Sequence, residues 1–142
     1  MIFGRTNKVK LLEKIPLFRD LSQRQLEQIA RLADEIDVPA GKRLATAGDT
    51  GRELFVIIEG QATVTAGRSK VTRLGPGDFF GEMSLIDGRP RSATVQASSP
   101  MRLLVVGQRE FWSLLDAAPP LVRKIMRTLS TRLRDAEAAV SA

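Results

Sequence analysis

The 142-residue sequence contains no cysteine and no histidine. Without cysteine the chain can form no disulfide and has no thiolate nucleophile, which fits a cytoplasmic protein. Without histidine it lacks the commonest metal ligand and the usual general base at neutral pH. These two absences argue against most metal-dependent enzymes and against hydrolases built on a catalytic triad.

The sequence also lacks any run of about 18 apolar residues that could span a membrane. Its basic N-terminus has no apolar segment of the kind found in secretory signals. With 43% hydrophobic and 27% charged residues, the composition is that of a globular protein, and the length suits one domain. We therefore expect a single cytoplasmic domain that does not associate with membranes.

The net charge of +6 is concentrated near the two ends of the chain. Residues 1–19 contain five Lys or Arg and one Glu, and residues 121–134 contain five Lys or Arg and no acid. Two interpretations remain open: solvated faces of terminal helices, or a surface that binds nucleic acid or another polyanion.

Hydrophobic spacing divides the chain into three segments. Residues 1–33 have helical spacing, and residues 108–142 return to it. Between them, residues 34–107 consist of short apolar runs separated by glycine-rich turns, which predicts antiparallel strands in a sandwich or rolled barrel. The predicted fold is mainly β with flanking helices: one domain built on an antiparallel, jelly-roll-like β-roll of about eight strands.

Local patterns refine this prediction at two places. Ser22, followed by Gln25, forms a capping-box pattern at the start of the second N-terminal helix, after a break at Pro16. The run LFVIIE at residues 54–59 is apolar almost throughout, which predicts a strand buried on both faces.

The most unusual stretch is FGEMSLIDGRPRSATV, residues 80–95. Gly81 lets a ligand approach the backbone, and a helical turn that begins at Glu82 would present unpaired N–H groups to an anion. Arg91 supplies a planar fork that matches two phosphate oxygens, and Ser92 adds a hydroxyl beside it. The Glu82 carboxylate can accept a hydrogen bond from a neighbouring hydroxyl. The set predicts a nucleotide ligand with one phosphate and a free ribose hydroxyl.

Each of these residues also has a purely structural interpretation. Glu82 could cap the short helix, where a carboxylate is favoured by the helix dipole. Arg91 could be a surface ion-pair partner of Asp87, and Ser92 could be an ordinary strand residue. The domain could also have kept the motif and lost its ligand.

The stretch resembles the phosphate-binding cassette of cyclic nucleotide-binding domains, such as those of catabolite activator proteins, protein kinase A regulatory subunits and cyclic nucleotide-gated channels. The similarity extends to IPLFRDLS, to AGKRLATAGDTGRELFVIIEGQATV and to GPGDFFGE, with the cassette at residues 79–95. It implies that Arg91 binds the cyclic phosphate, that Glu82 binds the ribose 2′-hydroxyl, and that Ser92 contacts the phosphate or the base. The full set of ligand-binding residues implied in this way is Val71, Thr72, Leu74, Gly81, Glu82, Met83, Ser84, Arg91, Ser92 and Arg132.

The resemblance implies a non-catalytic sensor without a cofactor, with cyclic AMP as the first candidate ligand and cyclic GMP as the second. Where activator-type relatives place a hydroxyl residue against the adenine amine, this sequence has Ala136 and Glu137, so the base preference stays open. No helix-turn-helix follows the β-roll within the 142 residues. We therefore expect a stand-alone protein, or a domain of a longer chain, without sequence-specific DNA binding. The alternative function is a basic nucleic-acid- or polyanion-binding protein on a degenerate scaffold of this family.

The last predicted helix carries apolar residues at alternating intervals of four and three, which is a heptad-like pattern. One interpretation is that this stripe packs on the chain's own β-roll. The other is that part of it closes over the ligand and the rest pairs with a second subunit or another protein, so that its movement is the output. The stripe consists of Val122, Met126, Leu129, Leu133, Ala136 and Val140.

Overall fold

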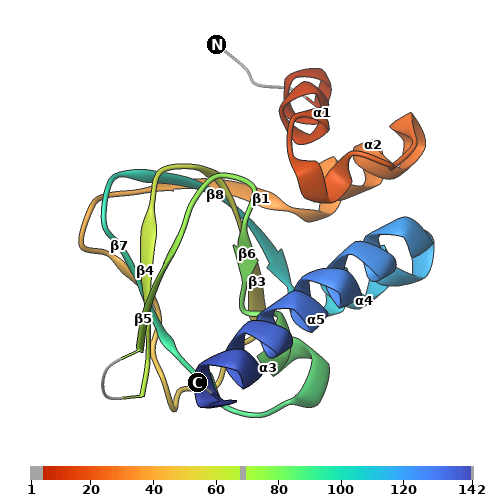
Figure 1. Cartoon of the computed structure of the whole chain (residues 1–142). Coiled ribbons are helices and arrows are strands. Elements are labelled where there is room, and N and C mark those ends of the chain that lie inside the picture. The colour runs from red at the N-terminus through yellow and green to blue at the C-terminus, as the bar shows by residue number, and fades with distance from the viewer. Residues whose placement is uncertain (1–4, 68–69, 142) are drawn as a thin grey trace.

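The computed structural model describes residues 5–67 and 70–141, which form a β-roll with helices on both sides of it in the chain (Figure 1). The N-terminal part consists of α1 (Arg5–Glu13), a 3-10 turn (Pro16–Phe18) and α2 (Gln23–Leu32). The β-roll consists of β1 (Asp34–Val38), β2 (Arg43–Ala45), β3 (Glu53–Glu59), β4 (Ala62–Ala66), β5 (Lys70–Leu74), β6 (Phe79–Phe80), the short helix α3 (Glu82–Asp87), β7 (Thr94–Ala97) and β8 (Met101–Gly107). It is followed by α4 (Gln108–Ala117) and α5 (Pro119–Ser141).

Pairing among the described strands gives two four-stranded antiparallel sheets, not one closed barrel. The first sheet has the order β1-β8-β3-β6, and the second has the order β2-β7-β4-β5. Figure 1 shows the second sheet on one side of the first and α3, α4 and α5 on the other. The expected β fold with flanking helices is confirmed. Its shortest strand, β6, spans only two residues, too few to show the alternation by which strands are recognised in a sequence.

Strand β3 explains how the first sheet can be covered on both faces. Leu54 and Val56 belong to a hydrophobic cluster shared with the helices, whereas Phe55 and Ile57 belong to a second cluster between the sheets. Because neighbouring residues of a strand face opposite sides, a strand between two cores must be apolar at every position. The prediction from the run LFVIIE is confirmed.

The N-terminal helices are positioned by the signals that the sequence contains. The hydroxyl of Ser22 accepts a hydrogen bond from the Gln25 backbone N–H, and the Gln25 side chain accepts one from the Ser22 backbone N–H. Such a box satisfies two N–H groups that the first turn of a helix leaves unpaired. The chain between α1 and this cap turns at Pro16, and α2 packs its apolar face into the helical cluster.

Helix α5 has one face on the domain and another in solvent. Leu121 and Ile125 are each 4% exposed and belong to the helical cluster, against which Leu129 also packs. Met126 and Leu133 are 63% and 60% exposed. The interpretation that the heptad-like stripe packs on the chain's own β-roll is therefore wrong for these two residues. The face that packs on the domain instead runs through Leu121, Ile125 and Leu129, at intervals of four residues. The side chain of Val140 lies outside the described residues. Among the residues that the structure describes, no helix has the length and apolarity needed to cross a membrane.

Candidate functional site

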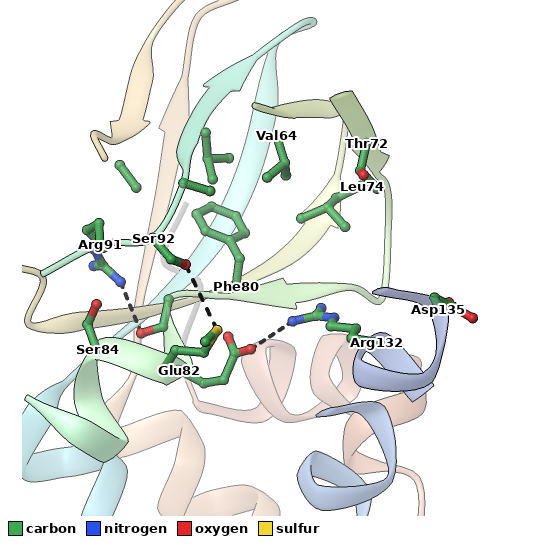
Figure 2. A pocket seen from close by; sticks show the side chains of 15 residues that line it. Val64, Thr72, Leu74, Phe80, Glu82, Ser84, Arg91, Ser92, Arg132 and Asp135 are labelled. Atoms are coloured by element: carbon green, nitrogen blue, oxygen red, sulfur yellow. Dashed lines mark hydrogen bonds and ion pairs between the residues drawn. The ribbon is translucent and has the colours of Figure 1, made fainter. Parts of the chain in front are cut away.

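A cavity of about 310 Å³ opens between the second sheet, α3 and the C-terminal half of α5 (Figure 2). Cavities of a few hundred cubic ångströms are typical of sites for small molecules. Nine of the ten residues predicted to bind a ligand line this cavity: Thr72, Leu74, Gly81, Glu82, Met83, Ser84, Arg91, Ser92 and Arg132.

The tenth residue, Val71, is not in the lining and is 60% exposed. It lies on β5 between Thr72 and residue 70, so its side chain points to the face opposite that of Thr72 and Leu74. The expectation that Val71 lines the pocket is therefore wrong.

The backbone around Gly81 brings α3 to the floor of the cavity. Gly81 precedes the first residue of α3 and has φ of 96°, a left-handed conformation that favours glycine. A Cβ at this position would lie 2.5 Å from the carbonyl oxygen of Glu53 and 2.6 Å from Nη1 of Arg91. Only glycine allows this close approach, and Glu82 and Ser84 follow it directly as buried polar residues facing the cavity.

Arg91 is held by backbone carbonyl groups on the opposite side of the cavity from α5. Its Nη1 donates to the oxygen of Gly81 at 3.0 Å, and its Nη2 donates to the oxygen of Glu53 at 2.9 Å. The side chain is 9% exposed, and it forms no ion pair with Asp87 or any other described residue. The proposed surface bridge to Asp87 is wrong. A guanidinium has five N–H donors, so three remain for a ligand.

The charge on Arg91 is therefore buried without a carboxylate at ion-pair distance among the described residues. Burial lowers the pKa of the Arg91 guanidinium, and the charges of Glu53 and Glu82 act in the opposite direction. An arginine stays protonated at neutral pH even so. A buried positive charge beside a cavity favours an anionic ligand.

Glu82 lies across the cavity floor from Arg91 and is 2% exposed. Its carboxylate Oε1 accepts a hydrogen bond from Nη1 of Arg132 at 2.8 Å (Figure 2). Burial raises the pKa of the Glu82 carboxyl, and the charge of Arg132, a hydrogen bond to the backbone of Glu82 itself, the hydrogen bond from Arg132 and the charge of Arg91 act against this rise. The first-turn position and the contact with Arg132 are both present, so Glu82 has a structural role at the start of α3 as well as a place in the cavity.

Arg132 connects α5 to the cavity by three contacts. Besides the ion pair with Glu82, its Nη2 donates to the carbonyl oxygen of Phe79 at 2.6 Å. Its guanidinium carbon also lies 4.8 Å from the centre of the Phe79 ring, within the range of a cation–π interaction. Arg132 thus joins the last helix to both β6 and α3.

The upper wall of the cavity is apolar and was largely missed by sequence reasoning. Val64 on β4 is opposite Val95 on β7 and Thr72 on β5, and all three line the cavity. Finding Val64 and Val95 requires the strand register, which the sequence does not state. Alternation from Thr72 and Leu74 would have identified the correct face of β5.

The residues that α5 contributes to the cavity lining differ from those expected near the base of the ligand. Neither Ala136 nor Glu137 lines the cavity, whereas Asp135, three residues after Arg132, does. Residues three apart lie on one face of a helix, so this spacing was the available signal. Within the described part of the chain, no group of three or more acidic, histidine or cysteine side chains could hold a metal ion.

Comparisons with known proteins agree with this geometry. Residues 35–118 match the family model described as the cyclic nucleotide-binding domain. The chain is 38% identical over 123 residues to a cyclic nucleotide-gated potassium channel of Rhizobium etli, covering 87% of this chain and 34% of the channel. It is 35% identical over 114 residues to the cAMP-dependent protein kinase regulatory subunit of Schizosaccharomyces pombe, covering 80% of this chain and 28% of that subunit. The chain thus spans about a third of the length of these curated relatives.

A solved structure shows the same architecture. The catabolite activator protein of Thermus thermophilus is 28% identical to this chain and superposes with a TM-score of 0.78. The match covers 89% of this chain and 62% of that protein.

Proposed function

The chain belongs to the cyclic nucleotide-binding domain family, and from this premise we propose that it is a non-catalytic sensor whose ligand is cyclic AMP. The observation that carries the proposal is the position of Arg91. Arg91, a residue that is 9% exposed and has no carboxylate at ion-pair distance among the described residues, lines a cavity of mononucleotide size. A ligand phosphate supplies the missing negative charge and accepts the remaining N–H groups.

In this proposal the other residues of the cavity contact the ribose, the phosphate and the base of the ligand. Glu82 accepts a hydrogen bond from the ribose 2′-hydroxyl, and the backbone from Gly81 to Ser84 donates to the ligand. Ser92, next to Arg91, contacts the phosphate or the base. Thr72 and Leu74 cover the sugar and base from the second sheet, since both side chains face the cavity.

Cyclic GMP is the second candidate ligand, because a carboxylate lies at the mouth of the cavity. Asp135 is an exposed residue of α5 and is part of the cavity lining. A carboxylate accepts hydrogen bonds from the exocyclic amine of adenine and also from the N–H groups of guanine. Cyclic AMP is preferred here on the similarity to the cAMP-dependent kinase subunit.

The output of the sensor, in this proposal, is movement of α5. Arg132 and the ribose hydroxyl bind the same carboxylate, because Oε1 of Glu82 accepts from Arg132 and the remaining acceptor sites of Glu82 are open to the ligand. A hydroxyl bound there draws on the same negative charge that holds Arg132. A bound ligand therefore changes the contacts that hold α5 on the β-roll, and it shifts the helix position by its differential affinity for the two positions. Hydrogen exchange across α5, with and without saturating cyclic AMP, tests this relay, and unchanged protection along the whole helix would contradict it.

The exposed residues Met126 and Leu133 provide a route for this movement to reach a second copy of the chain or another protein. A cytoplasmic location also belongs to this proposal, since the sequence has no cysteine and its N-terminus lacks the apolar segment of a secretory signal.

Titration calorimetry with cyclic AMP, cyclic GMP and linear AMP is the test of the ligand. We expect cyclic AMP to bind most tightly and linear AMP most weakly, because a linear 5′-phosphate cannot place its charge beside the 2′-hydroxyl. Repeating the titration between about 50 and 200 mM salt separates the pocket from polyanion binding, whose affinity falls by orders of magnitude over that range. No heat with either cyclic nucleotide, or a steep loss with salt, would refute the proposal and favour the polyanion-binding alternative.

A further inference from the structure

The guanidinium of Arg91 lies in a slot between two glycines that belong to different loops. Gly81 lies against Nη1 of Arg91, as described above. Gly51, in the loop before β3, lies against the middle of the same side chain. A Cβ built on Gly51 would overlap Nε and Cζ of Arg91 and would come within 2.6 Å of Cδ. The slot therefore exists only while residue 51 has no side chain.

Arg91 cannot easily move aside, because its backbone and its side chain are both anchored. Its backbone N–H donates to the oxygen of Asp49 at 2.7 Å, and its own carbonyl oxygen accepts from the N–H of Gly48 at 2.9 Å. The guanidinium is fixed to the carbonyl groups of Gly81 and Glu53. An added methyl group at position 51 must therefore break one of these bonds or displace its own loop.

The conformation of Gly51 separates this steric role from backbone strain. Gly51 is not among the glycines with positive φ, whereas Gly81 is. An alanine at position 51 is compatible with the backbone, so its effect comes from contact alone. We propose that Gly51 is a positioning residue that holds the Arg91 guanidinium in its phosphate-binding orientation. The phosphate part of this inference rests on the proposed function.

The first test is calorimetric titration of the Gly51→Ala chain with cyclic AMP. We expect its affinity to fall by about ten- to a hundredfold, the range set by misplacing charge-assisted hydrogen bonds. Gly75→Ala is the matched control, because Gly75 also lacks positive φ and its added Cβ would meet only the flexible amide of Gln61 at 3.1 Å. The control should bind as the parent does. Adenosine, which has no phosphate, should bind the parent and Gly51→Ala equally.

A second test needs no ligand and compares melting temperatures in two backgrounds. In the parent, Gly51→Ala should lower the melting temperature, because the methyl group meets the anchored Arg91 side chain. In the Arg91→Ala background the space is vacated, so the same substitution should be neutral or raise the melting temperature by restricting the unfolded chain.

These outcomes separate the inference from the proposed function. Equal cyclic AMP affinity of Gly51→Ala and parent, or an equal drop in melting temperature in both backgrounds, would overturn the positioning role. An equal loss of affinity for cyclic AMP and adenosine would show a general distortion of the pocket and would also overturn it. A parent chain that binds no cyclic nucleotide would refute the proposed function, while the melting comparison would still decide whether Gly51 and Arg91 are coupled.

Discussion

Arg91→Ala removes the charge that we assign to the phosphate of the ligand. Because Arg91 is 9% exposed and has no carboxylate at ion-pair distance among the described residues, a bound phosphate would form a largely desolvated pair with it. Truncating one partner of such a pair costs about 2–5 kcal/mol, which is roughly thirtyfold to several thousandfold in affinity.

The free protein should tolerate the same substitution. Arg91→Ala removes two hydrogen bonds to the carbonyl groups of Gly81 and Glu53, but it also removes a buried charge that lacks an ion-pair partner in the free domain. These effects oppose each other, and water can enter the cavity to solvate both carbonyl groups. We expect the variant to stay folded, with a change in unfolding free energy of about 1 kcal/mol, well below its loss in binding.

Titration calorimetry with cyclic AMP and urea unfolding, on the same preparations, measure both quantities. Arg89→Ala is the matched control, because Arg89 is an exposed arginine of the same loop. It should change the affinity by less than about fivefold, as expected for a surface charge. An Arg91→Ala chain that binds cyclic AMP as tightly as the parent would show that the phosphate is bound elsewhere.

Three further predictions concern the floor and the mouth of the cavity. Glu82→Gln should weaken cyclic AMP binding by about 1–3 kcal/mol in calorimetry. Burial raises the pKa of Glu82, so its carboxyl is protonated at a higher pH than an ordinary glutamate. The affinity of the parent for cyclic AMP should therefore fall on acidification. The affinity of Glu82→Gln should change less with pH. Arg132→Ala should speed hydrogen exchange in α5 without ligand, because the contacts to Glu82 and Phe79 are lost. Unchanged exchange would show that the apolar contacts of α5 with the helical cluster are enough to hold it in place. Met126→Glu with Leu133→Glu should lower the molar mass seen by light scattering at high protein concentration, and identical masses for parent and variant would exclude pairing through this stripe.

The floor of the cavity could be predicted from the sequence because its polar residues lie in one short segment. Gly81, Glu82, Arg91 and Ser92 lie within one helical turn and the loop after it, so their types and spacing could be recognised in the sequence. The anchoring of Arg91 on Glu53 and Asp49 is not local and could not be read in this way. The capping box at Ser22 is local in the same sense.

Contacts between distant segments could not be predicted in this way. The ion pair of Glu82 with Arg132 joins residues 50 positions apart, and its geometry depends on how α5 packs. The lining by Val64 depends on the register of β4 against β5 and β7. Val71 shows how sensitive such inferences are, because a displacement of one residue along a strand reverses the face.

The two-sided burial of β3 has a consequence for the chain before it is folded. A segment such as Leu54–Ile58 combines high strand propensity with no charge, which is the composition of segments that associate between chains. Its partner β8 lies far along the sequence, so during synthesis this segment emerges well before the strand that covers it. Glu53 and Glu59 flank it at both ends, and both are exposed in the folded domain. Charges in these positions oppose aggregation of the nascent chain, so the two glutamates act on the path to the native state in addition to their charge interactions with Arg91 and Arg102 in the folded domain.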